Sequence, residues 1–180
     1  MSLRVPAFLA VGLCFSVLCG CSRPLLVVDE STRAAIVEFR NNSGGHLQQF
    51  YFGDPVNCQE PHLIDDSIQP FQSKTHRIPA EKVITIWTSA WRLPVKQGYV
   101  AWCRPHAFST VLAEGQRYEI FFDADLYNNR CGTRFFSSSG APVKRIDREV
   151  SGPEIGGGGV LAGSFSCKPT EALKELSPRE

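Results

Sequence analysis

Short apolar stretches separated by turn residues dominate the middle of the chain. Residues 35–40 (Ala-Ile-Val-Glu-Phe-Arg) alternate partly between apolar and polar positions, and residues 46–52 (His-Leu-Gln-Gln-Phe-Tyr-Phe) form a second apolar stretch. The cluster between them, residues 41–45 (Asn-Asn-Ser-Gly-Gly), is rich in turn-forming residues. Two such stretches around a turn cluster are typical of a β-hairpin. We therefore expect residues 35–52 to form two paired strands.

A run of β-branched and aromatic residues marks the centre of the predicted sheet. Residues 82–88 (Lys-Val-Ile-Thr-Ile-Trp-Thr) are too apolar on both faces for an exposed edge strand. Four more short stretches have the composition of strands: residues 99–103, 108–112, 116–123 and 131–136. No helical periodicity alternates with them. About seven strands separated by turns predict an all-β protein, an antiparallel β-sandwich or barrel, rather than a parallel sheet.

One motif narrows the topology. The segment Leu112-Ala-Glu-Gly-Gln-Arg-Tyr118 has the spacing L-x-x-G-x-x-Y. It resembles the tyrosine corner of Greek-key β-sandwiches, in which the Tyr hydroxyl bonds to the backbone just upstream as the chain crosses between sheets. The resemblance implies an immunoglobulin-like or transthyretin-like β-sandwich. An ordinary hairpin with a buried Tyr118 is the alternative, and both give an all-β domain.

The last part of the chain differs in composition from the rest. Residues 152–159 (Gly-Pro-Glu-Ile-Gly-Gly-Gly-Gly) predict a flexible hinge, because no Gly-Lys-Ser/Thr follows as a phosphate-binding loop requires. Residues 160–167 predict a late strand, and residues 169–176 a short C-terminal helix with Pro in its first turn. We therefore assign residues 35–150 to the sandwich domain and residues 151–180 to a hinge, a late strand and a C-terminal tail.

The start of the chain has the layout of an export signal. Arg4 precedes a nearly unbroken apolar run, residues 5–18, which at about 14 residues fits a secretory h-region and is too short to span a bilayer. The run ends in Leu18-Cys-Gly-Cys21. This tetrapeptide resembles the lipobox of bacterial lipoproteins, with Cys19 in the slot usually held by Ala or Ser. An ordinary signal peptide followed by an unrelated Cys is the alternative.

The lipoprotein resemblance implies that residues 1–20 are a signal peptide and that Cys21 becomes the acylated first residue. Three acyl chains, at about 0.8 kcal/mol per buried methylene, would hold the protein permanently in a membrane. Ser22, in place of Asp, implies export to the outer membrane, with the domain facing the periplasm. Residues 21–34 would then be the lipid anchor and a short tether, so the domain would sit close to its membrane.

Cysteine usage agrees with an oxidising compartment. Of the seven Cys, the lipoprotein interpretation removes or lipidates three: Cys14, Cys19 and Cys21. The remaining four allow two disulfides in three connectivities. We prefer Cys103–Cys131, at apolar strands, and Cys58–Cys167, which would fasten the late segment to a polar loop. The closest pair is separated by about 28 residues, far from the C-x-x-C spacing of a zinc site, and closing that loop would be worth on the order of 3 kcal/mol.

Composition and charge exclude several classes of protein. A length of 180 residues suits one domain, and an apolar content of 43% excludes a disordered chain. The formal net charge of +1, from 19 Lys and Arg against 18 Asp and Glu, gives no basic surface for nucleic acid. The absence of long apolar stretches excludes a polytopic membrane protein.

Candidate catalytic chemistry is sparse. The densest group is His62-Leu-Ile-Asp65-Asp66, where a His and two carboxylates could hold a metal or polarise a water. Because adjacent side chains of a strand point to opposite faces, Asp65 and Asp66 converge only in a loop, and we favour a solvated polar loop. Residues 123–129 begin with oxygen-bearing side chains at the spacing of a calcium-binding loop. They lack the Gly and the closing Glu of such a loop, so a polar turn is favoured. We therefore predict no catalytic residue, no cofactor and no metal.

The aromatic residues offer a candidate binding surface. We expect Trp87 and Trp102 in the core, which needs large aromatics. Trp91, beside Arg92, is as well suited to a surface as to the core. Trp and Arg dominate the hot spots of protein interfaces, so Trp91 and Arg92 are the candidate partner-binding residues.

Three classes of function remain open, and the first is expected. It is a membrane-anchored, non-catalytic envelope lipoprotein that binds another envelope protein, as an assembly or secretion accessory. The second is a periplasmic immunity or inhibitor lipoprotein that inserts a protruding loop, residues 53–73, into an enzyme. The third is a hydrolase, in which His62, Asp65 and Asp66 would converge in a pocket.

Overall fold

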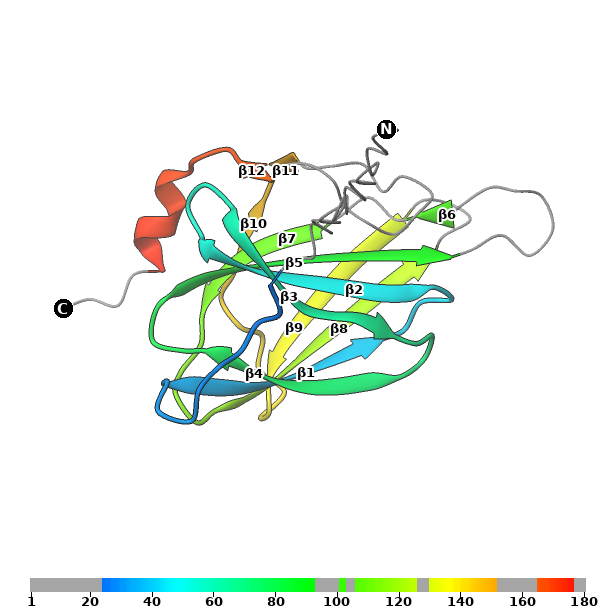
Figure 1. The fold of residues 1–180 in the computed structure, drawn as a ribbon, viewed down its shortest axis with the longest axis horizontal. Helices are drawn as coiled ribbons and strands as arrows, with labels where there is room; N and C mark the ends of the chain where they lie inside the picture. Colours follow the sequence, from blue (N-terminus) through cyan, green and yellow to red (C-terminus); the bar gives the residue numbers. More distant parts are fainter. Residues whose placement is uncertain (1–23, 93–100, 103–105, 126–129, 152–164, 177–180) are drawn as a thin grey trace, which may run out of the picture.

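The computed structural model describes residues 24–92, 101–102, 106–125, 130–151 and 165–176, except the side chains of Arg92, Ala101 and Trp102. Figure 1 shows the strands and one short 3₁₀ helix. Their bounds are β1 Ala34–Asn41, β2 His46–Asp54, β3 Gln59–Ile68, β4 Ser73–Pro79, β5 Val83–Arg92, β6 Ala101–Trp102, β7 His106–Val111, β8 Arg117–Asp125, β9 Arg130–Ser137, β10 Ile146–Arg148, β11 Val150–Ser151, β12 Ser166–Cys167 and η1 Glu171–Glu175.

The strands form two packed sheets and a small two-stranded ladder of β11 and β12. The smaller sheet has the order β4–β1–β8–β9, and the larger has the order β10–β7–β5–β2–β3, with β6 pairing β5. The one parallel pair among the described strands is β1 with β8. The predicted all-β antiparallel sandwich is confirmed. None of the described helices is long and apolar enough to cross a membrane.

The predicted hairpin of residues 35–52 is wrong. Strand β1 pairs with β4 and β8, whereas β2 pairs with β3 and β5 in the other sheet. Asn41 explains the crossing, because its side-chain amide donates to the carbonyls of Gly45 (2.8 Å) and Ile68 (2.9 Å). Its Oδ1 accepts the Ser43 amide at 2.9 Å. These bonds fix residues 41–45 as a corner between sheets rather than a turn within one.

Residues 53–73 are not the protruding loop that the inhibitor alternative requires. Most of this segment is β3, which pairs with β2 along its length. Strand β3 is the edge of the larger sheet, and β4 is the edge of the smaller one. Edge strands tolerate charged side chains such as Asp66, so their sequences lack the apolar alternation that marks central strands. The loop on which the inhibitor alternative depends is therefore absent.

The main hydrophobic core lies between the two sheets. Alternate residues of each strand point into it, as period-two geometry requires. On β1 these are Ala35, Val37 and Phe39, each fully buried. Strand β5 contributes Ile84, Ile86 and Ala90 from one face and Trp87 from the other. The prediction that residues 82–88 are too apolar for an exposed edge is confirmed for residues 84–88, which are buried on both faces of the strand, whereas Lys82 is exposed.

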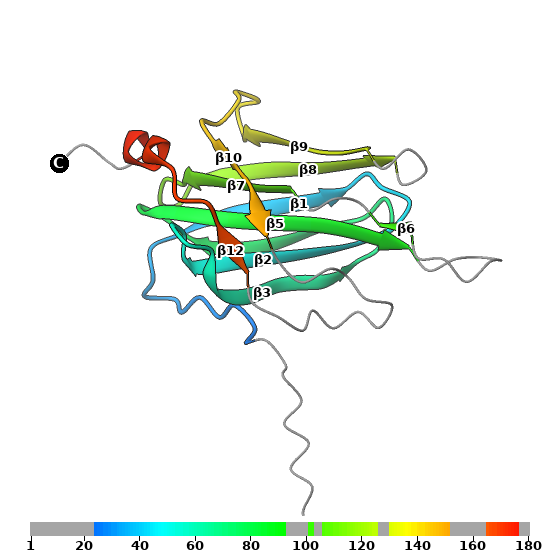
Figure 2. The same cartoon turned by 90° about the horizontal axis from the view of Figure 1, so that it is seen from above.

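A second hydrophobic cluster covers the outer face of the larger sheet. Phe165 lies among Phe50, Phe52 and Trp87, with ring centroids 5.7, 5.2 and 5.5 Å away. Figure 2 shows β12 crossing over β5 and β2, where these contacts are made. The segment that the sequence predicts as a late strand therefore covers this sheet. Trp87, only 1% exposed, is buried by it, as expected of a core residue.

The tyrosine corner is confirmed. The hydroxyl of Tyr118 accepts a hydrogen bond from the amide of Ala113 at 2.9 Å. Gly115 has a φ of 72°, the left-handed conformation that this turn needs and that glycine adopts at little cost. The motif lies where the chain passes from β7 in the larger sheet to β8 in the smaller one, as the resemblance implies.

The C-terminal helix is shorter than expected. It is a 3₁₀ helix, η1, capped by Thr170, whose hydroxyl accepts the Ala172 amide at 3.3 Å. Of the predicted late strand, β12 is the part that the structure describes. The predicted glycine hinge, residues 152–159, lies outside the described residues.

Candidate functional site

The structure places the predicted site residues in separate regions. Trp91 stacks on His46 of the neighbouring strand, with ring centroids 4.9 Å apart, and is partly exposed. The side chain of Arg92 and the whole of Cys21 and Cys103 lie outside what the structure describes. The pairing of Trp91 with Arg92 as a binding surface therefore stays a prediction.

Cys58 and Cys167 form a disulfide, with Cα atoms 5.3 Å apart. This is the pair preferred from the sequence. Cys131 is also disulfide-bonded, and Cys103, its predicted partner, lies outside the described residues. The Cys58–Cys167 bond fastens the covering segment to the turn before β3, which keeps Phe165 on the outer face of the larger sheet.

The proposed hydrolytic trio is not the group that the fold assembles. His62 lies beside the ring of Tyr51, with centroids 6.1 Å apart, and Asp66 is exposed. Asp65 instead pairs with Lys74 of β4, and His76 of the same strand lies beside it. A strand rather than a loop carries Asp65 and Asp66, so the two adjacent carboxylates point to opposite faces.

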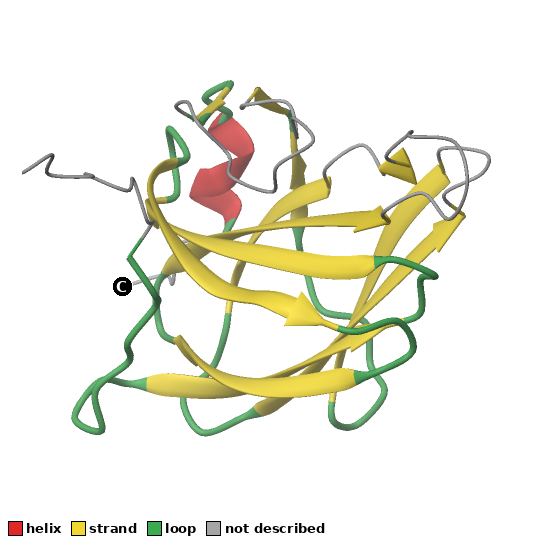
Figure 3. Ribbon diagram, turned by 45° about the vertical axis from the view of Figure 1, so that its right-hand side comes forward, coloured by secondary structure: helices red, strands yellow, loops and turns green. Residues whose placement is uncertain are grey.

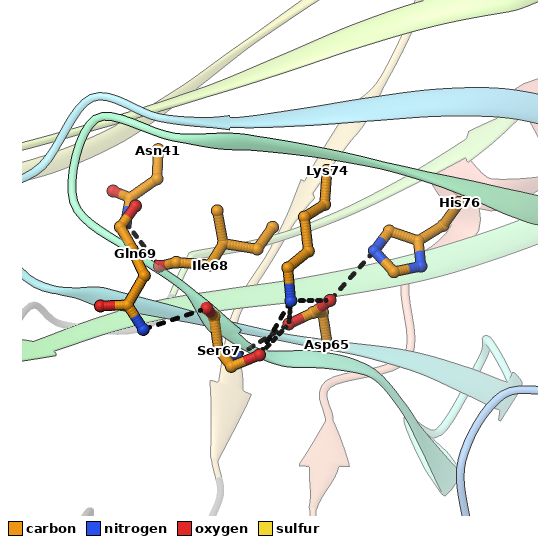
Figure 4. A network of polar contacts seen from close by, with 7 residues as sticks. All are labelled: Asn41, Asp65, Ser67, Ile68, Gln69, Lys74 and His76. Carbon is orange, nitrogen blue, oxygen red and sulfur yellow. Dashed lines mark hydrogen bonds and ion pairs between the residues drawn. The ribbon is translucent and has the colours of Figure 1, made fainter.

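Asp65 is the centre of a polar network that links the edge strands of the two sheets (Figure 4). Lys74 Nζ lies 3.1 and 3.0 Å from the two carboxylate oxygens, and His76 Nε2 lies 3.2 Å from Oδ2. The amide of Ser67 donates to Oδ1 at 2.8 Å. Because β3 and β4 belong to different sheets, these bonds close one open edge of the sandwich.

Burial and charge act in opposite directions on this network. Burial raises the pKa of the Asp65 carboxyl, but the Ser67 amide and the Lys74 ammonium outweigh it, so that the pKa lies below its usual value. Burial lowers the pKa of His76, and the neighbouring Asp65 offsets this only in part. At neutral pH the network therefore holds an ionised Asp65 and a neutral His76.

A second polar network closes the opposite edge, between β7 and β9. His106 Nδ1 lies 2.7 Å from the Thr133 hydroxyl, which also accepts from Arg145 Nη1 at 3.0 Å. Because a guanidinium only donates, the Thr133 proton is available for His106 Nδ1. Neutral His106 then carries its proton on Nε2, which faces Asp147 Oδ1 at 3.7 Å. Thr133 is only 4% exposed, so this Thr–His–Asp group lacks an accessible nucleophile. Its contacts instead join the two sheets at this edge.

Burial also lowers the pKa of His106. Asp147 opposes this shift, and Arg145 adds to it. Arg145 in turn pairs with Asp147 at 3.2 Å. Each open edge of the sandwich thus holds a neutral His between an acidic and a basic side chain.

The outer face of the smaller sheet carries a set of residues that the sequence analysis missed. Phe121 of β8 stands between Arg40 of β1 and Arg134 of β9, which are its register partners on either side. The two guanidinium carbons lie 5.4 and 5.1 Å from the ring centroid. Phe136 packs against Phe121 edge-on, with centroids 5.9 Å apart. We call these four residues the arginine–phenylalanine face.

Carboxylates hold both arginines in place. Arg40 contacts Glu38 at 3.2 Å and Glu119 at 3.4 Å. Arg134 makes a forked pair with Asp123, at 2.7 and 3.1 Å, and this lowers the pKa of Asp123. The segment predicted as a polar turn or calcium loop thus uses Asp123 to orient an arginine.

The described residues contain no group of three or more His, Cys, Asp or Glu that could hold a metal ion. Compared with protein-family models and with curated proteins, the chain matches none.

Proposed function

We propose that this protein is a membrane-anchored bacterial envelope lipoprotein whose non-catalytic β-sandwich binds another envelope protein through the arginine–phenylalanine face. The observation that carries the proposal is the position of Phe121, in register between Arg40 and Arg134 on the outer side of a sheet. Aromatic residues and Arg are enriched at protein interfaces, where they supply most of the binding energy.

The arrangement of this face favours binding because it is pre-organised. Each guanidinium is held over the ring by carboxylates, so a partner need not order these long side chains. The donors that remain on Arg40 and Arg134 suit acidic side chains or backbone carbonyls of the partner. The face therefore fits a protein surface with an apolar centre and acceptors around it.

The anchor rests on the sequence Leu18-Cys-Gly-Cys21 and is supported by a backbone contact of Pro24. Pro24, three positions after Cys21, already bonds to the edge of the larger sheet: its carbonyl accepts the Leu63 amide at 2.9 Å. Three residues span at most about 10 Å, so an acylated Cys21 would hold the domain against its membrane. Intact mass of protein from the membrane fraction tests this, with a mature chain starting at a triacylated Cys21 expected. A chain cleaved elsewhere, or without acyl chains, would refute the anchor.

Partner capture tests the binding face. The lipidated protein is crosslinked in the cells that make it, purified under denaturing conditions, and its partners are quantified by mass spectrometry. We expect Phe121→Ala to lower recovery of one stoichiometric envelope protein by about tenfold or more, as loss of a hot-spot residue does. Phe71→Ala removes the same type of side chain from an exposed turn at a different edge and is the matched control. Equal recovery with Phe121→Ala and Phe71→Ala, or capture of no protein, would overturn the proposal.

A further inference from the structure

The exposed large apolar side chains of the described residues gather around one strand. They are Leu25 (61% exposed), Val27 (75%), Val56 (44%) and Phe71 (77%). Leu25 is bridged to Leu63 in β3, and Val27 follows in the same segment. Val56 lies in the turn before β3 and Phe71 in the turn after it. The edge around β3 is therefore the part of the described surface where such side chains collect.

Two of these residues, Leu25 and Val27, belong to the segment before β1, residues 24–33. It pairs with β3 in parallel, since the Leu26 amide donates to the Leu63 carbonyl at 2.8 Å. Leu26 packs against the inter-sheet core, so the alternation of an extended chain leaves Leu25 and Val27 outside. Figure 3 shows this segment as the loop that descends from the larger sheet to the start of β1.

Phe71 has no packing role that explains it. Its backbone lies in the left-handed region, with a φ of 59°, where a bulky residue is unusual and Gly or Asn is common. An exposed aromatic at a strained turn is more readily explained by a contact outside the domain. Aromatic and aliphatic side chains of this kind insert into the boundary between headgroups and acyl chains.

Charges around β3 are mixed. Glu60 and Asp66 are exposed on β3, and Lys74 and Arg77 lie on the adjacent β4. Asp29 and Glu30, exposed in the segment after Val27, add two acidic residues, so four acidic residues stand against two basic ones and the edge has no attraction for an anionic surface. Contact would depend on the apolar side chains and on the anchor rather than on lipid charge.

We propose that the β3 edge is the surface by which the domain lies on the bilayer, with Leu25, Val27 and Phe71 entering the interfacial layer. This rests on the proposed lipid anchor, because the short link from Cys21 to Pro24 brings this edge to the membrane. The arginine–phenylalanine face belongs to the other sheet, so it would remain available to a protein partner while the edge is docked.

Lipid quenching measures this contact directly. A fluorescent amino acid is placed at Phe71 or at Val27, and at Ser139, an exposed turn residue after β9 on the far edge. Each lipidated protein is reconstituted in vesicles of phosphatidylethanolamine with phosphatidylglycerol, and in vesicles of pure phosphatidylcholine, both carrying nitroxide-labelled acyl chains. We expect quenching at positions 71 and 27 to exceed that at 139 by at least about twofold, as for side chains buried 5–10 Å into the interface. It should be similar in both lipids.

The outcomes separate the two proposals. Equal quenching at positions 71 and 139, in protein whose mass shows acyl chains on Cys21, refutes docking of the edge and leaves the anchor intact. A mass without acyl chains refutes the anchor itself. Strong quenching only in the phosphatidylglycerol vesicles contradicts the charge argument, and a protein crosslinked at position 71 in cells would show that a protein covers this edge instead of lipid.

Discussion

Arg148 Nη1 donates a hydrogen bond to the carbonyl of Pro55 at 2.9 Å, which joins β10 to the turn before β3 across the outer face of the larger sheet. The same guanidinium donates to Val56 (2.8 Å), to Ser109 (3.0 Å) and to Lys168 (3.1 Å). Arg148 is only 7% exposed. It therefore binds together a turn, two strands and the C-terminal covering segment.

Replacement of Arg148 by Met should lower the free energy of unfolding by about 3 kcal/mol, because the Pro55, Val56 and Lys168 carbonyls lose a shared donor in a buried site. Arg148→Lys keeps the charge but not the forked donors, and should be intermediate. Urea unfolding measures both. A Met variant within about 0.5 kcal/mol of the parent protein would show that Arg148 does not hold this region together.

Loss of the Cys58–Cys167 disulfide should destabilise the domain by about 2–4 kcal/mol, since it links residues separated by 109 positions. The double variant Cys58→Ser with Cys167→Ser should also loosen residues 165–176, because the covering segment loses its covalent link and keeps non-covalent contacts such as the Phe165 ring contacts and the Arg148–Lys168 bond. Limited proteolysis followed by mass spectrometry reports that loosening. If the double variant is cleaved in this segment no faster than the parent protein, the disulfide does not hold the cover.

Tyr118→Phe should lower the free energy of unfolding by about 1 kcal/mol. The ring keeps its packing on Phe135, with centroids 5.6 Å apart, while the Ala113 amide loses its acceptor. Thermal unfolding of this variant beside the parent protein gives the difference. An unchanged melting temperature would mean that the corner hydrogen bond contributes nothing to stability.

Stability should fall as the pH drops below about 6.5, the usual pKa of His. The folded protein holds His76 and His106 with lowered pKa values, so the unfolded chain takes up protons at higher pH than the folded one. Each His can contribute at most about 1.4 kcal/mol per pH unit in that range. Urea unfolding at about pH 5 and pH 7 should therefore show lower stability at the acidic value.

The variant His106→Asn keeps an acceptor near Thr133 but does not titrate, so its loss of stability between the two pH values should be smaller. His76→Asn acts at the opposite edge, and the two effects should add. If both variants retain the full pH dependence of the parent protein, His76 and His106 are not the source of that dependence.

Local patterns in the sequence were sufficient for the features that depend on local structure. Residues 82–88 are apolar on both faces because β5 lies between a core and a cover, and the spacing from Leu112 to Tyr118 specifies the corner by itself. The choice of Cys58 with Cys167 also agreed with the structure. For β5 and the corner, neighbours along the chain carry the information, whereas the disulfide joins residues 109 positions apart and was inferred from the even number of Cys and the character of their segments.

Features that depend on strand pairing could not be obtained in the same way. Residues 41–45 have the composition of a hairpin turn, and only the bond from Asn41 to Ile68, 27 positions away, makes them a corner. Asp65 meets His76 because β3 and β4 close one edge of the sandwich, whereas sequence proximity suggested His62. Arg40 reaches Phe121 through the parallel pairing of β1 with β8, although alternating polar residues around Phe121 on β8 were a visible signal.

Photocrosslinking from position 121 tests the central claim most directly. Benzoyl-phenylalanine placed at Phe121 keeps an aromatic ring on the arginine–phenylalanine face, and the same residue at Phe71 is the control on the other edge. In cells that carry the lipidated protein, we predict one defined crosslink to an envelope protein from position 121 and none from position 71. The absence of a protein crosslink at 121, or the same crosslink from both positions, would contradict the account.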